Sequence, residues 1–192
     1  MAKENYLLSR QHDYFNLSFL PLVIFTNIYL VQNLNSMSIW YYCVVFGSYM
    51  ISDITWIYFY PHSVASPNII SLHHGLCIIG ILTLPCVDIS FIRWVALGGL
   101  TEVNTFLLIV KRSLRHHMFL EIAFLISWCV FRLIIAPLVF VNLFWLLFYF
   151  PNNILHYFIF IEALFFNLLN IKWTHDLIKK YKQKKDNEYH RL

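Results

Sequence analysis

The chain has 192 residues, of which 59% are hydrophobic and only 12% are charged, and its formal net charge is +4. Its mean hydropathy is +0.62. Soluble domains carry about 25% charged residues, so this composition excludes an ordinary water-soluble domain and indicates a protein surrounded by lipid. No polar stretch is long enough to form a second domain.

Six segments have the length of a membrane-spanning helix, which is about 20 apolar residues. In chain order they cover about 14–31, 39–60, 68–85, 91–110, 119–141 and 154–171. We therefore predict an all-α, polytopic membrane protein with six core transmembrane helices. The apolar stretch 142–151 is too short to span alone. After Pro137 it is either a kinked extension of the fifth helix or an interfacial hairpin.

Basic residues set the expected topology, because lysine and arginine near helix ends gather on the cytoplasmic side. Six spans place the three basic regions of the sequence, 3–10, 111–115 and 179–185, on one side. We therefore expect a cytoplasmic N-terminus (1–13), a transmembrane domain (14–178) and a basic cytoplasmic tail (179–192). The tail is short and adjoins a membrane helix, so we expect it to contact anionic lipid head groups and not nucleic acid.

Two adjacent histidines, His73 and His74, lie near the start of the third predicted span. Ionisable residues within a span are costly and point to function. Asp53, Glu102 and Glu162 lie on three other spans at similar depths, about 8 to 13 Å from the cytoplasmic side at 1.5 Å per residue. Their convergence predicts a polar pocket open to the cytoplasm. The alternative is that these groups only clamp helices together.

Arg132 lies deeper than the other ionisable residues, at about 20 Å from the same side. A charge at this depth faces the bundle interior and needs partners. A structural pair with Glu162 is one explanation, and a contribution to the pocket is the other.

The histidine pair suits proton transfer better than metal binding. Consecutive helical residues point about 100° apart, so His73 and His74 cannot both bind one metal from a single face. The sequence has no HxxxH set, and its four cysteines form no CxxC pair; we expect no metal. One imidazole can act as a general base or accept an acyl group itself, and Asp53 or Glu102 can fix its tautomer.

The polar motifs of the spans resemble, in their order, those of the TLC domain. The resemblance covers about residues 39–182 and rests on five short motifs: Ser52-Asp53, Leu72-His73-His74, Thr101-Glu102-Val103-Asn104-Thr105, Phe131-Arg132 ahead of Pro137, and Asn170 with Trp173.

The TLC family includes the ceramide synthases, the translocating-chain-associating membrane proteins and other TLC-domain-containing proteins. The resemblance implies six core helices around a cytoplasm-facing cavity and a location in the endoplasmic reticulum. It matches His73 and His74 to the histidines that ceramide synthases need for acyl transfer from acyl-CoA to a sphingoid amine. Where those enzymes continue with a His-Asp and a further Asp, this chain has Leu100-Thr101-Glu102. That element is closer to the non-synthase branch, which is linked to lipid homeostasis.

Two main hypotheses for the function follow, and a transporter or channel is a third. The first is acyl transfer from acyl-CoA to a lipid amine or hydroxyl, with His73, His74, Asp53 and Glu102 as catalytic residues. The second is a non-catalytic lipid-binding or lipid-homeostasis protein that uses the same pocket. In both, membrane lipids are the partners. The remaining polar pocket or structural residues are Arg132, Glu162, Asn104, Asn170 and Trp173. No GxxxG motif indicates an oligomeric state.

Overall fold

The computed structural model describes residues 2–114 and 117–189, without the side chains of residues 2–5 and 184–189. Within these ranges the chain forms helices and no strand. The elements are α1 (Ala2–Gln32), α2 (Ser36–Phe59), η1 (Pro61–Ser63), α3 (Pro67–Thr83), η2 (Leu84–Cys86), α4 (Ile89–Gly99), α5 (Glu102–Ser113), α6 (Met118–Ser127), the π-helical η3 (Trp128–Ile135), α7 (Ala136–Tyr149) and α8 (Ile154–Tyr189).

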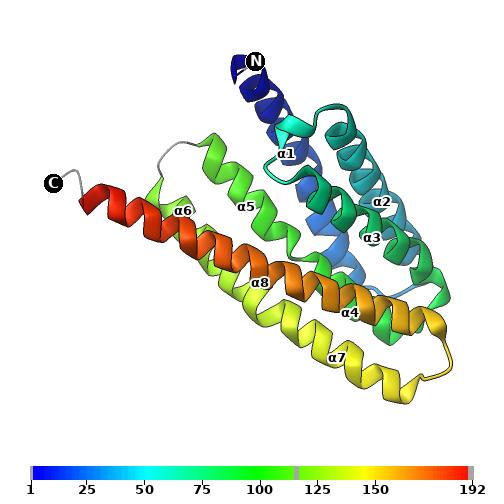
Figure 1. Cartoon of the computed structure of the whole chain (residues 1–192). Coiled ribbons are helices and arrows are strands. Elements are labelled where there is room, and N and C mark those ends of the chain that lie inside the picture. The colour runs from blue at the N-terminus through cyan, green and yellow to red at the C-terminus, as the bar shows by residue number, and fades with distance from the viewer. Residues whose placement is uncertain (1, 115–116, 190–192) are drawn as a thin grey trace.

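The described elements form six passes along one bundle: α1, α2, α3, α4 with α5, α6 through α7, and α8. The start of α1 and the end of α8 lie at the end of the bundle that also holds η1 and the end of α5 (Figure 1). The connections after α1, α3 and α7 lie at the opposite end. The prediction of an all-α polytopic membrane fold is confirmed.

Five segments are long and apolar enough to cross a membrane: 6–32, 67–86, 89–113, 118–149 and 154–183. The remaining pass, α2, has 24 residues but is less apolar, because tyrosines, serines and Asp53 interrupt it. It packs between α1 and α3, so protein covers much of its polar surface.

Local signals explain where several helices begin. Asn35 accepts a hydrogen bond from the Ser38 amide (2.9 Å) and forms a capping box at the start of α2. Asp88 accepts from the Ser90 amide (2.8 Å) at the start of α4. Pro67 starts α3, at a position where its missing N–H leaves no bond unmade.

Two passes contain a break in regular α-helix. The fourth pass turns at Leu100 and Thr101, between α4 and α5. The fifth runs from α6 through η3 into α7, with Pro137 near the start of α7. Residues 142–149 continue α7, so the stretch after Pro137 is an extension of the helix and not a hairpin.

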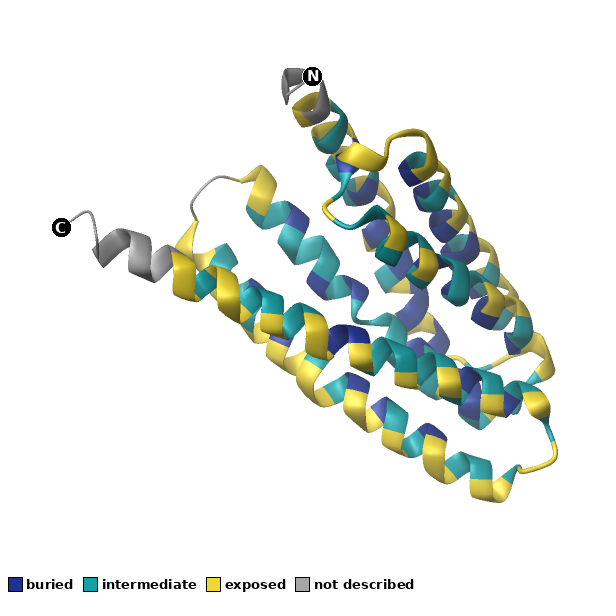
Figure 2. Cartoon of the chain, viewed as in Figure 1, coloured by how far each residue is buried: buried dark blue, intermediate teal, exposed yellow. Residues whose placement is uncertain are grey.

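Burial follows the pattern expected of a protein in lipid. One apolar cluster joins α1, α2, α3 and α4 and includes Leu20, Val23, Phe46, Met50 and Ile81. A second joins α4, α7 and α8. Exposed residues run along the outward faces of the helices (Figure 2), and many are large and apolar, such as Leu82 and Phe148. Such faces suit contact with acyl chains better than contact with water.

Gly99 allows a close approach between α4 and α1. A Cβ atom at this position would collide with the side chain of Asn27. Asn27 is fully buried, and its amide donates to the Val23 carbonyl (2.8 Å), so it has little freedom to move. A Cβ atom at Gly75 in α3 would have no atom of a packed neighbour within 4 Å.

We therefore expect Gly99→Ala to lower the free energy of unfolding by about 1–3 kcal/mol, the usual cost of overpacking. Gly75→Ala is the matched control and should be neutral or stabilising by up to about 1 kcal/mol, because alanine favours the helix. Thermal unfolding of the two variants in detergent checks this. Equal melting temperatures would show that the contact between Gly99 and Asn27 does not limit packing.

Candidate functional site

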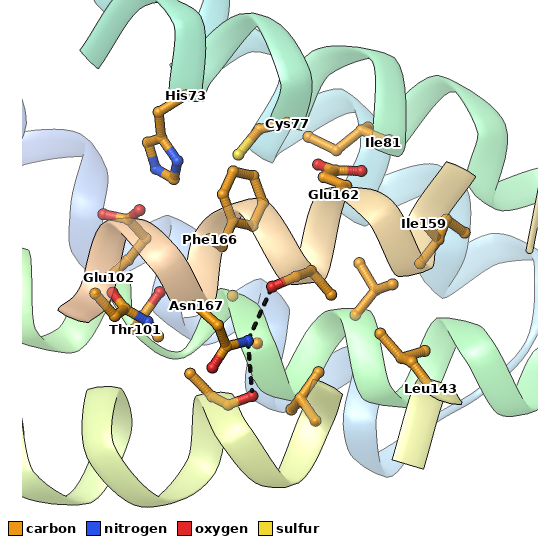
Figure 3. Close-up of a pocket in the computed structure, with 18 of the residues that line it drawn as sticks. His73, Cys77, Ile81, Thr101, Glu102, Leu143, Ile159, Glu162, Phe166 and Asn167 are labelled. Atoms are coloured by element: carbon orange, nitrogen blue, oxygen red, sulfur yellow. Dashed lines mark hydrogen bonds between the residues drawn. The ribbon is translucent and has the colours of Figure 1, made fainter. Parts of the chain in front are cut away.

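A narrow cavity of about 100 Å³ lies within the bundle, lined by residues of α2, α3, α4, α5, η3, α7 and α8. Figure 3 shows His73, Thr101 and Glu102 toward one end and Leu143 and Ile159 toward the other. We call these the polar end and the apolar end. Along α8 the lining runs from Ile159 to Trp173, a rise of about 21 Å at 1.5 Å per residue. The cavity is therefore long and thin, and its shape suits an extended chain better than a bulky ring system.

Helical periodicity places the lining residues. Residues three or four apart share one face of a helix. On α8 the cavity face carries Ile159, Glu162, Phe166, Asn170 and Trp173, and on α3 it carries His73, Cys77, Gly80 and Ile81. The polar residues of each helix thus lie in line with apolar ones, which produces a channel with two chemically different ends.

Arg132 belongs to the polar end and is held by side chains of two other helices. Its Nε donates to Asn104 Oδ1 (3.0 Å), and one terminal nitrogen donates to Asn170 Oδ1 (2.7 Å). Its guanidinium lies over the rings of Trp128 (5.0 Å) and Trp173 (4.9 Å). A guanidinium has five N–H donors, and these two bonds use two of them. The group is therefore fixed in place with donors left for an anion or a carbonyl oxygen.

His73 also faces the polar end and is held by aromatic rings. Phe166 and Trp173 both meet it edge-on, with ring centroids 4.7 Å and 5.9 Å away. Its Nδ1 is buried and has no hydrogen-bond partner among the described residues. An imidazole held in one orientation beside a cavity suits proton exchange with a ligand.

Asp53 lies behind the cavity in a buried polar cluster. His12 Nε2 is 2.6 Å from one carboxylate oxygen, and His74 Nδ1 is 3.1 Å from the other. The amide of Asn16 is 3.4 Å from the first oxygen, and the Tyr49 hydroxyl donates to Asn16 Oδ1 (2.7 Å). A carboxylate buried in this way is stabilised by neighbours that donate hydrogen bonds or carry positive charge.

Two carboxyl groups line the cavity itself. Glu102 is buried at the start of α5, and the hydroxyl of Thr105 hydrogen-bonds to it. Glu162 lies beside Gly80 of α3, where any Cβ atom would collide with its carboxyl oxygens. No hydrogen bond or ion pair joins Glu162 to another described residue. Of the two explanations that the sequence left open for Arg132, a pair with Glu162 is therefore wrong, since Arg132 bonds to two amides instead.

The structure brings most of the predicted site residues to one cavity. Those that line it are His73, Glu102, Arg132, Glu162, Asn170 and Trp173. The other three stand behind it: His74 and Asp53 contact each other, and Asn104 holds Arg132.

Sequence reasoning missed three members of the Asp53 cluster: His12, Asn16 and Tyr49. A signal was present, because His12 and Asn16 are four residues apart, and so are Tyr49 and Asp53. Each pair lies on one face of its helix, and α1 packs against α2. Placing the first span at residue 14 hid this match, because it left His12 outside the membrane.

The donor sets favour binding of organic or anionic groups. Within the described ranges, no group of three or more His, Cys, Asp or Glu side chains is placed to hold a metal ion. The fixed guanidinium of Arg132 provides a place for an anion or a carbonyl oxygen.

Comparisons with known proteins add no relative: no family model, no curated protein and no solved structure matches the chain. The fold and the cavity by themselves define the class: a polytopic helical membrane protein with a buried amphipathic cavity.

The Asp53 cluster predicts a large stability effect. Asp53→Leu removes the shared partner of two buried histidines, so we expect a loss of about 3–5 kcal/mol in the free energy of unfolding. Asp176→Leu is the control, since it removes a half-exposed partner of Lys172 (3.0 Å) and should leave the free energy of unfolding almost unchanged, because exposed ion pairs contribute little. Denaturant unfolding in detergent measures both variants. Similar losses in the two would contradict a special role for the buried cluster.

Proposed function

We propose that the protein is a membrane enzyme of lipid metabolism that transfers an acyl group from acyl-CoA to a lipid amine or hydroxyl, with His73 as general base. One observation carries the proposal. A single narrow cavity places a fixed imidazole and a fixed guanidinium at the head of an apolar channel. A lipid chain in the channel would bring its reactive end to His73.

The chemistry asked of His73 is an ordinary acyl transfer. The lipid nitrogen or oxygen attacks the thioester carbonyl while His73 takes the proton from the attacking atom. The new C–N or C–O bond forms and the C–S bond breaks. The departing thiolate then takes the proton from His73 and leaves as the free thiol of coenzyme A.

Arg132 and Glu102 have supporting roles in this proposal. The donors that Arg132 keeps free would stabilise negative charge on the thioester oxygen during attack. Glu102, at the same end of the cavity, would attract the positive charge that His73 gains when it takes the proton. His74 and Asp53 would position His73 from behind.

The resemblance to the TLC domain supports the same proposal. Its motifs supply the cavity residues of α3, α5, η3 and α8, and the family provides a precedent for a histidine pair in acyl transfer. On this basis the protein would lie in the endoplasmic reticulum, with both termini in the cytoplasm and acyl-CoA arriving from that side.

One observation favours a non-catalytic lipid-binding protein as the alternative. The carboxylate of Asp53 contacts His74 and not His73, and Nδ1 of His73 has no partner among the described residues. No side chain that the structure describes therefore bonds to this nitrogen to fix the tautomer of the imidazole, which a general base ordinarily requires. The same cavity would then hold a lipid without changing it.

Mass spectrometry of the purified protein with mixed acyl-CoAs and lipid acceptors separates the two functions. We expect acylated lipid and free coenzyme A from the wild type, and a loss of about 10²- to 10⁴-fold in rate for His73→Ala, the usual contribution of a general base. His74→Ala should reduce the rate less than His73→Ala, because His74 contacts Asp53 and only positions His73. His62→Ala, on the exposed turn η1, is the control. Co-purified lipid without turnover in the wild type or in any variant would contradict the enzyme proposal and support the lipid-binding alternative.

The topology is tested separately by glycosylation tags placed after residue 192 and in the connection 150–153. Both termini in the cytoplasm predict modification of the tag at 150–153 alone. Modification of the C-terminal tag would reverse the orientation and remove the access route proposed for acyl-CoA.

A further inference from the structure

The middle of the cavity contains a carboxyl group that the proposed acyl transfer does not use. Glu162 lies between the polar and apolar ends, close to Cys77, Ile81 and Phe166 (Figure 3). It is not in contact with Arg132, which bonds to Asn104 and Asn170. A carboxyl group in apolar surroundings is costly unless it is hydrogen-bonded, and no described residue supplies that bond.

Tyr42 gives a second, independent observation in the same cavity. It is 1% exposed and lines the cavity from α2. Its hydroxyl oxygen is buried and has no hydrogen-bond partner among the described residues. Tyr42 is buried and Glu162 is half-buried, and both line the same cavity without a hydrogen-bond partner among the described residues. Because polar groups removed from water are nearly always paired, we infer that a ligand in the cavity pairs with them.

The two groups together select a chemical class. A carboxyl group accepts hydrogen bonds whether or not it is ionised, and a phenol needs an acceptor for its own proton. A ligand hydroxyl has one donor and two acceptor lone pairs, so it satisfies both groups at once. A protonated amine has donors only and would leave the phenol unpaired.

The position of Glu162 sets where this hydroxyl lies on the ligand. Glu162 and Asn170 are eight residues apart on one face of α8, which corresponds to about 12 Å. Asn170 bonds to Arg132 and so marks the polar end. An extended chain advances roughly 1.2 Å per bond, judged from the polypeptide backbone, so 12 Å corresponds to about ten carbons.

We propose that the cavity selects a long-chain lipid that carries a hydroxyl group within its chain, about ten carbons from its polar head, with Glu162 and Tyr42 as the residues that recognise this hydroxyl. This inference rests on the proposed lipid-binding cavity and adds the substrate class. Glu162 acts here in specificity and not in the transfer step.

Binding of four saturated fatty acids of equal length to the full-length protein in detergent tests the proposal. One is unsubstituted, one has a hydroxyl about ten carbons from the carboxylate, one has it on the carbon beside the carboxylate, and one has an amine at the ten-carbon position. We expect the mid-chain hydroxyl to bind about tenfold more tightly than the other three, from two buried hydrogen bonds. Displacement of a fluorescent fatty acid provides the readout.

Variants then locate the effect. Glu162→Leu and Tyr42→Phe should each reduce the preference for the mid-chain hydroxyl while the unsubstituted acid still binds. Asn142→Leu, an exposed amide on α7 that bonds only to its own helix backbone (2.7 Å), is the matched control and should keep the preference. The wild-type comparison stands even if one variant fails to fold.

The outcomes separate this inference from the proposed function. Equal binding of all four acids, or tightest binding of the amine or of the hydroxyl beside the carboxylate, would overturn the selection of a mid-chain hydroxyl and leave lipid binding intact. A preference that persists in both Glu162→Leu and Tyr42→Phe would remove these residues from recognition. No binding of any acid would overturn the lipid-binding cavity itself.

Discussion

The fixed position of Arg132 is the constraint on which the site depends. A guanidinium within a membrane bundle needs partners, and here they come from α5 and α8 as amides and from η3 and α8 as indole rings. Because Asn104 also bonds to Ser127 (2.8 Å), the network joins three passes of the chain. It gives the cavity a rigid polar end, and the apolar part of the cavity extends from that end.

The two adjacent histidines lie in two different environments. His73 faces the cavity among aromatic rings, whereas His74 faces Asp53 and, through it, His12. The ring centroids of the two histidines lie 5.2 Å apart. A positive charge on one ring therefore disfavours a positive charge on the other. Adjacent residues on a helix thereby link a ligand-facing surface to a buried charge cluster without a separate structural element.

Much of the architecture could be predicted because the thickness of the bilayer fixes the length of each spanning helix. Apolar length predicted an all-α, polytopic fold, and depth counting placed His73, Glu102 and Glu162 around one space. Counting residues gives the depth of a side chain along the membrane normal, but it gives no information on how each helix is rotated about its own axis. It therefore could not separate His73, which lines the cavity, from Asp53, which lies behind it. It also left open a pair between Arg132 and Glu162, whereas the structure gives Arg132 two neutral amides as partners.

The π-helical segment η3 makes the fifth pass sensitive to a change in its number of residues. A π turn accommodates an additional residue compared with an α turn, and each residue of an α-helix turns the chain by about 100°. A deletion of one residue within η3 would restore regular helix and rotate everything before it relative to α7. Arg132 would then leave the line that it shares with Ala136, Val139 and Leu143 along the cavity. Chain length in this one segment, and not only residue identity, thus determines whether the charged group of Arg132 faces the cavity or the outside of the bundle.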